Sequence, residues 1–116
     1  GAAGVLVEHA RAGIGRGLQF ELFRPGQVEI KDYYAVLPIA LRVTGRFHDV
    51  GAFTADVANL SRIVTLHNLA ITPTKDTAGT LSMDAVARTY RYLDVVELAE
   101  VRKAREAEAK AKAPRK

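Results

Sequence analysis

Cysteine is absent from the sequence, and no segment forms a long uninterrupted apolar run. Without cysteine the chain can form neither a disulfide nor a thiolate metal site, and its redox compartment stays undetermined. A membrane-spanning helix needs roughly 18 consecutive apolar residues, and the opening GAAG has neither the basic nor the apolar part of a signal peptide. The chain begins without Met, so we interpret it as an excised piece of a longer protein, for which a missing anchor means little.

Patterns typical of an active site are missing as well. The three histidines, His9, His48 and His67, lack metal-ligand spacing. We expect His67 to be a structural histidine bonded to a neighbour, and His48 to belong to a helix cap. The glycines of GIGRG (13–17) follow a helix and open a strand, whereas a dinucleotide-binding loop follows a strand and opens a helix. We therefore expect no catalytic, cofactor-binding or metal-binding residues and no enzymatic activity.

What the chain does contain is enough apolar sequence for one globular domain. It has 116 residues, of which 48% are hydrophobic, and a net charge of +4. Residues 1–93 hold 10 Lys and Arg against 8 Asp and Glu, and residues 94–116 hold 7 against 5. We expect a folded domain over residues 1–98 and an Ala/Lys-rich tail, 99–116, in which a short helix frays into a helical or disordered end.

The hydrophobic period switches along the chain between that of helices and that of strands. Residues 5–12 and 48–60 have helical spacing, and Asp49 is the expected N-cap of the second helix. Four segments alternate as strands: 17–23, 37–47, 61–71 and 81–93. The order α-β-β-α-β-β predicts an α+β fold of the ferredoxin-like type, a four-stranded antiparallel sheet with two helices on one face. The arrangement is permuted, with the strands in the order third, fourth, second, first, so that 61–71 becomes an edge strand.

The register between the last two strands decides which of their side chains are exposed. A symmetric hairpin through the loop 73–79 pairs Ile71 with Leu81 and His67 with Ala85, and it turns the odd positions of both strands toward the helices. The even positions then gather on the open face of the sheet: Val64, Leu66, Val86, Tyr90 and, at its end, Tyr92. A slip of one residue would reverse this assignment.

The helix over residues 48–60 offers a second candidate surface. Its small residues at i, i+4 and i+7 would let another helix or strand approach closely: Gly51, Ala55 and Ala58. An ordinary solvent-exposed helix face is the alternative interpretation.

Two further classes of function remain open. Arg88, Tyr90 and Tyr92 share one strand face, as do the base-stacking aromatics of ferredoxin-like RNA-recognition modules, and the tail is basic. The RNP1 pattern of those modules is absent, so an RNA-binding module that uses the open sheet face is the alternative rather than the leading hypothesis. A small-ligand regulatory domain would require a pocket.

Several long segments resemble the PilO family of type IV pilus inner-membrane proteins: GRGLQFELFRPG (15–26), GRFHDVGAF…ADVANLSRIVTL (45–66) and LSMDAVARTYRYLD (81–94). The resemblance implies a ferredoxin-like periplasmic domain that follows a membrane helix and a coiled coil in the full-length, membrane-anchored protein. It also implies homodimers, heterodimers with PilN, and a link, made together with the lipoprotein PilP, from the inner-membrane motor platform to the outer-membrane secretin. It implies no catalytic residues.

The sequence therefore predicts a non-enzymatic interaction domain of the type IV pilus inner-membrane alignment subcomplex. We expect this piece to be a soluble periplasmic domain of a bacterial inner-membrane protein. It would associate with itself or with PilN through the edge strand 61–71, the open-face residues beside it or the small-residue helix stripe, because strand edges and contiguous apolar surface commonly form interfaces.

Overall fold

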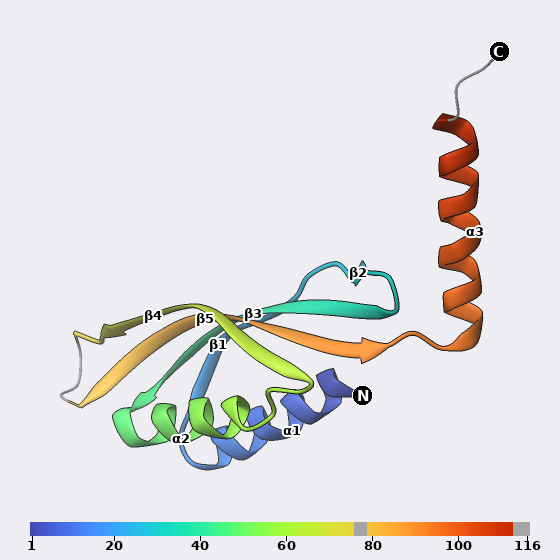
Figure 1. The fold of residues 1–116 in the computed structure, drawn as a ribbon. Helices are drawn as coiled ribbons and strands as arrows, with labels where there is room; N and C mark the ends of the chain where they lie inside the picture. Colours follow the sequence, from blue (N-terminus) through green and yellow to red (C-terminus); the bar gives the residue numbers. More distant parts are fainter. Residues whose placement is uncertain (76–78, 113–116) are drawn as a thin grey trace.

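The computed structural model describes residues 1–75 and 79–112, and it shows an antiparallel sheet with two helices side by side on one face (Figure 1). In chain order its elements are α1 (Ala2–Gly15), β1 (Gln19–Pro25), β2 (Glu29–Ile30), β3 (Tyr34–Arg46), α2 (Phe47–Ala58), β4 (Val64–Pro73), β5 (Thr80–Tyr92) and α3 (Val95–Lys112). The strands lie in the order β1-β3-β5-β4, and β2 pairs with β3. The predicted α+β fold and its permuted strand order are confirmed; the two-residue strand β2 is an addition that the polar sequence around it did not indicate.

The core lies between the sheet and the helices α1 and α2. Successive residues of a strand point to opposite faces, and the odd positions of β3 and β5 point toward the helices. The helices meet them with Leu6 of α1 and with three buried residues of α2, Val50, Phe53 and Val57. The buried residues that β3 and β5 contribute to this core are Ile39, Leu41, Val43, Met83 and Ala87.

The glycines between α1 and β1 serve packing and chain reversal. Helix α1 ends at Gly15, and Gly17 has φ +105, a left-handed conformation that glycine adopts without strain. Leu18 is 2% exposed, and its side chain packs closely against both Gly13 and Gly45. A Cβ added to Gly13 would lie 2.7 Å from the Leu18 Cδ1, and a Cβ added to Gly45 would lie 2.5 Å from the Leu18 Cδ2. The segment 13–17 is thus the helix end and turn that the sequence predicted.

The predicted register with β5 is wrong in two respects. At the hairpin end Ile71 pairs with Met83 rather than Leu81, a shift of two residues that keeps the same face, and a β-bulge in β4 then changes the pairing by a single residue. His67 pairs with Val86 but Ala70 pairs with Asp84, so Asn68 and Leu69 together lie opposite one residue. Asn68 takes a left-handed φ of 56, which asparagine tolerates better than most residues. The extra residue reverses the alternation, and on the N-terminal side of the bulge the even positions of β4 face the helices.

Val64 and Leu66 therefore do not lie on the open face, contrary to our prediction. Val64 pairs with Thr89 and is fully buried in the core, and Leu66 pairs with Ala87 and packs against the same core.

A second bulge, in β1 between Phe20 and Leu22, also exchanges the two faces of its strand. It turns Phe20 and Phe23 toward the core, although strict alternation would place them on opposite faces.

The start of α2 also differs from expectation. The helix begins at Phe47, its N-cap is Arg46, and the Asp49 carboxylate accepts a hydrogen bond from the Arg46 Nε at 2.9 Å. Asp49 is therefore a residue of the first turn rather than the N-cap. His48 lies on the exposed surface of that turn, with its ring against Phe47, which is itself 66% exposed.

Helix α3 stands away from the two layers, on the side of the sheet opposite to α1 and α2 (Figure 1). It is longer than the short helix expected for the tail, and none of its residues is buried. An ion pair between Arg105 and Asp32 joins it to the loop between β2 and β3. Residues 113–116 of the tail and 76–78 of the predicted 73–79 loop lie outside the described residues.

Candidate interaction surface

The edge strand β4 exposes apolar side chains at its C-terminal end. Beyond the bulge every residue from Asn68 to Pro73 is exposed, with Leu69 at 50% and Ile71 at 60%. The β4–β5 hairpin extends past the start of α2, so the helix layer does not cover this end (Figure 1). Among the strands of residues 1–75 and 79–112, β4 is the last of the sheet, so none of them lies beside its outer main-chain groups. Such an edge can accept another extended chain.

The open face beside β4 carries a network of polar and aromatic groups. Tyr90 and Val86 of β5 lie on this face, as predicted, and both are half-buried. The Thr65 hydroxyl lies 2.7 Å from the His67 Nε2 and 3.0 Å from the Tyr90 hydroxyl. His67 is thus bonded to a neighbour, as the sequence predicted. Thr65 and His67 are the β4 residues that the bulge places on the open face, and this network engages polar side-chain atoms of both.

All four tyrosines of the chain gather where the sheet meets α3. The rings of Tyr33 and Tyr92 stack, with 6.3 Å between their centroids and 21° between their planes. The ring centroid of Tyr34 lies 5.2 Å from that of Tyr33 and 6.2 Å from that of Tyr90. A hollow of about 430 Å³ opens beside them. We call it the tyrosine groove; it is lined by Tyr33, Tyr34, Arg62, Ile63, Tyr90, Arg91 and Tyr92. The sequence showed Tyr90 and Tyr92 on one face but not the convergence with Tyr33 and Tyr34.

The small residues of α2 form an exposed stripe. Gly51, Ala55 and Ala58 all face away from the core, and a Cβ placed on Gly51 would meet no atom within 4 Å. The stripe is therefore accessible to a partner, as the interaction hypothesis requires.

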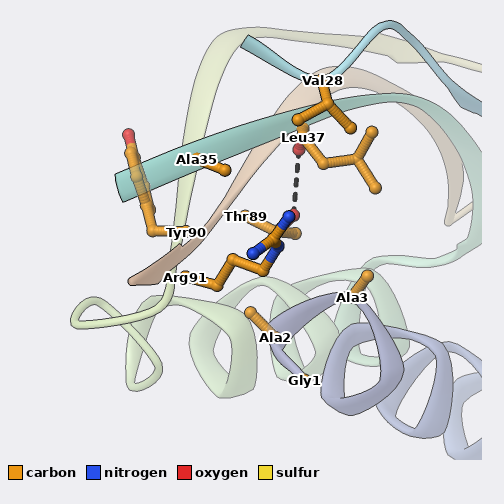
Figure 2. A pocket seen from close by; sticks show the side chains of 9 residues that line it. All are labelled: Gly1, Ala2, Ala3, Val28, Ala35, Leu37, Thr89, Tyr90 and Arg91. Atoms are coloured by element: carbon orange, nitrogen blue, oxygen red, sulfur yellow. Dashed lines mark hydrogen bonds between the residues drawn. The ribbon is translucent and has the colours of Figure 1, made fainter. Parts of the chain in front are cut away.

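A small apolar pocket of about 130 Å³ lies between the start of α1 and the sheet (Figure 2). Figure 2 shows Val28, Leu37 and Thr89 around it, with the Thr89 hydroxyl donating a hydrogen bond of 3.0 Å to the Leu37 carbonyl oxygen. That bond satisfies the hydroxyl of Thr89, which is buried. The other lining residues are Gly1, Ala2, Ala3, Ala35, Tyr90 and Arg91, and the surface that the pocket presents is mostly apolar, so it offers a ligand few polar contacts.

Several ionisable groups form ion pairs at the surface. The Arg42 Nε donates to Asp84 at 2.8 Å, and an Arg88 nitrogen lies 3.7 Å from Glu29. Arg91 donates to both oxygens of Glu97 at 2.9 Å, and this bonding lowers the pKa of Glu97 to about 2. In the part of the chain that the structure describes, no group of three or more His, Asp and Glu residues could hold a metal ion.

The comparisons with known proteins agree with one another. The family model described as the type IVa pilus alignment subcomplex PilO C-terminal domain matches residues 2–94. The type IV pilus inner membrane component PilO of Pseudomonas aeruginosa is 39% identical over 92 residues, which are 78% of this chain and 44% of that protein. The chain thus spans less than half the length of this relative. No helix in residues 1–75 and 79–112 is both long and apolar enough to cross a membrane.

Two solved structures from the same organism share the fold. The crystal structure of the type 4 fimbrial biogenesis protein PilO of Pseudomonas aeruginosa is 38% identical, with a TM-score of 0.66 over 78% of this chain and 68% of that one. The core region of PilO from the type IV pilus system of that organism is 39% identical, with a TM-score of 0.64 over 77% of this chain and 92% of that one. The chain therefore belongs to the PilO family and contains its C-terminal domain, a component of the type IVa pilus alignment subcomplex.

Proposed function

We propose that this domain is a non-enzymatic, periplasmic interaction module that pairs with a second copy of itself and with PilN. Together with PilP, these pairs would connect the inner-membrane motor platform to the outer-membrane secretin. The observation that carries the proposal is the free edge of β4, where Leu69 and Ile71 are half or more exposed beside unpaired main-chain groups. Exposed apolar edge strands are normally protected in monomeric proteins, because they recruit other strands.

The set of residues that we propose as partner contacts differs from the set expected from the sequence. The β4 edge beyond the bulge takes the place of Val64 and Leu66, because Val64 is buried and Leu66 packs against the core on the helix side of the sheet. Val86 and Tyr90 on the open face, and the stripe Gly51, Ala55 and Ala58 on α2, remain proposed contact surfaces. The stripe is exposed and Val86 and Tyr90 are half-buried, so a partner can reach all five residues, which supports the proposal.

The first experiment tests the β4 edge with charges. Ile71→Lys and Leu69→Asp each place a charge on an exposed side chain, and Ile14→Lys on α1, where Ile14 is 55% exposed, is the matched control. Sedimentation velocity measures self-association, and co-purification with the periplasmic part of PilN measures pairing. We expect both edge variants to reduce self-association or PilN pairing at least about fivefold, because a buried unpaired charge costs more than 1 kcal/mol at an interface.

The same assays distinguish the edge from the helix stripe. Ala55→Arg places a long side chain on α2 and tests that surface separately. If both edge variants and Ala55→Arg stay folded by circular dichroism and both associations persist unchanged, the proposed surfaces are wrong. A loss with Ile14→Lys of the same size would also contradict the proposal.

A further inference from the structure

At the end of the sheet next to α3, β5 continues beyond its neighbour β4. The β4–β5 ladder ends at the pair of Val64 and Thr89, whereas the β3–β5 ladder runs on to the pair of Tyr34 and Tyr92. Residues 59–63, which precede β4, form a turn that leads from α2. The last residues of β5 therefore have a paired strand on one side only.

The hydrogen bonds around this end show which main-chain groups lack a neighbour. The Tyr90 N–H donates to the Ile63 carbonyl at 2.8 Å on the β4 side, and the Leu93 N–H donates to the Tyr33 carbonyl at 2.9 Å on the β3 side. Because the groups of an antiparallel strand alternate in direction, the N–H and C=O of Tyr92 point to the β4 side. There they border the tyrosine groove, between Tyr92 and the turn that carries Ile63.

The side chains of the groove add flat apolar faces to this main-chain edge. Tyr92 is 81% exposed and Tyr33 is 57% exposed, although tyrosine rings usually bury their faces and leave only the hydroxyl wet. Adjacent tyrosine faces beside an extended main chain are the features with which peptide-binding domains hold proline or aromatic side chains. The groove thus suits an extended peptide.

The charged side chains around the groove determine which ligand charge it would prefer. Arg91 is paired with Glu97 and Arg88 with Glu29, so neither has its charge free. Arg62 is exposed, and no carboxylate of residues 1–75 and 79–112 lies within ion-pair distance of its guanidinium. Among the residues that line the groove, Arg62 is the one cation without an ion-pair partner, and it matches a single carboxylate. An RNA backbone would require several free cations along its path, whereas the groove lining offers one.

We propose that the tyrosine groove binds an extended segment of a partner protein that carries a proline or aromatic residue next to an acidic one. The peptide main chain pairs with Tyr92, its ring packs on Tyr33 and Tyr92, and its carboxylate pairs with Arg62. The site is separate from the β4 edge beyond the bulge, and its occupation does not depend on pairing there.

Fluorescence anisotropy on the whole chain tests the groove with a labelled heptapeptide, GEPVPYG, and its charge-reversed counterpart, GKPVPYG. We expect saturable binding of GEPVPYG and at least about threefold weaker binding of GKPVPYG, a difference in the range of one exposed ion pair. Arg62→Glu should reverse this preference. Tyr92→Ser should weaken both peptides at least about fivefold, since exposed aromatic anchors dominate such contacts. Arg11→Glu is the matched control for Arg62→Glu, and Phe47→Ser, at an exposed aromatic residue of similar size, is the control for Tyr92→Ser. Both controls lie outside the groove and should leave binding unchanged.

A second readout locates the peptide. In a ¹H–¹⁵N spectrum, GEPVPYG should shift the amide signals of Arg62 and Tyr92 and leave those of Leu69 and Ile71 in place. The proposal is overturned if neither peptide binds saturably, or if Tyr92→Ser binds as tightly as the unaltered chain. It is also overturned if a mixed single-stranded RNA binds through Arg62 and Tyr92 while the peptides do not, or if Tyr92→Ser converts a dimer into a monomer in sedimentation, which would make a second copy the occupant.

Discussion

At the scale of single residues, Glu97 shows how one side chain connects α3 to the sheet. The Glu97 N–H donates to the Asp94 carboxylate at 2.8 Å, and the Asp94 N–H donates to the Glu97 carboxylate at 3.1 Å, the reciprocal bonds of a capping box. The two terminal nitrogens of the Arg91 guanidinium, Nη1 and Nη2, donate to the Glu97 carboxylate. Four hydrogen bonds thus define where β5 ends and in which direction α3 begins.

This arrangement predicts a specific response to acid. The pKa of Glu97 is lowered from 4.5 to about 2, first by the Arg91 hydrogen bonds and then by the Asp94 backbone N–H. Because the pKa is lower in the folded chain than in the unfolded one, the stabilisation is complete above pH 4.5 and is lost as the pH falls toward 2. An NMR titration of the Glu97 carboxyl carbon should give a midpoint near 2.

The variant Glu97→Gln supplies the control for this titration. It removes the titrating group and the charge of the Arg91 pair, so amide protection in the first turn of α3 should no longer change over this pH range. A Glu97 carboxyl that titrates at its ordinary value, or an unchanged acid response in Glu97→Gln, would contradict the assignment.

At the scale of elements, the two bulges decide which face each strand presents. One extra residue in β4 turns Val64 and Leu66 inward and leaves Thr65 and His67 on the open face. Side-chain direction in a strand has a period of two, so any single inserted residue exchanges the two faces. The apolar residues on both faces of the segment 61–71 are explained by this exchange rather than by a partner along its whole length.

The bulge makes Asn68 sensitive to β-branched substitution. Asn68→Val should lower the free energy of unfolding by about 1–2 kcal/mol, because the backbone crowds a β-branched side chain at a left-handed φ of 56, which asparagine tolerates. Asn68→Gly should change it by only a few tenths, since glycine accepts this conformation. Urea denaturation followed by circular dichroism measures both, and Thr72→Val, exposed in the same strand, controls for side-chain type. Equal stability of Asn68→Val and the unaltered chain would show that the bulge is absent in solution.

At the scale of the whole molecule, a compact two-layer domain carries a helix that projects from it. The longest dimension is 71 Å and the other two are 26 and 18 Å, and Figure 1 shows that α3 extends the molecule beyond the sheet. Its contacts with the domain are made through ion pairs rather than buried apolar residues. The two proposed binding regions, the β4 edge and the tyrosine groove, lie toward opposite ends of the sheet, so one domain could hold two partners.

Removal of most of α3 should therefore leave the domain intact. Deleting residues 99–116 removes the Arg105–Asp32 pair, whose side chains are 54% and 71% exposed, and exposed pairs contribute about 0–1 kcal/mol. We expect the free energy of unfolding to change by less than about 1 kcal/mol in urea denaturation. As a comparison, Leu93→Ala, at a residue 6% exposed, should cost about 2–4 kcal/mol. A cooperative loss of stability on deletion would mean that α3 is part of the core.

The sequence by itself determined the elements of the two layers apart from β2, the permuted strand order and the family, because local hydrophobic period and turn residues are properties of neighbouring positions. It also determined the exposure of the α2 stripe and the open-face positions Val86 and Tyr90. Only the tertiary structure decided that Val64 and Leu66 face the core, because apolar residues on both faces of 61–71 fit a bulge and a partner alike, and the pairing of two strands decides between them. The tyrosine groove was likewise decided by the tertiary structure. Its four rings come from residues 33–34 and 90–92, and only the pairing of β3 with β5 brings them together.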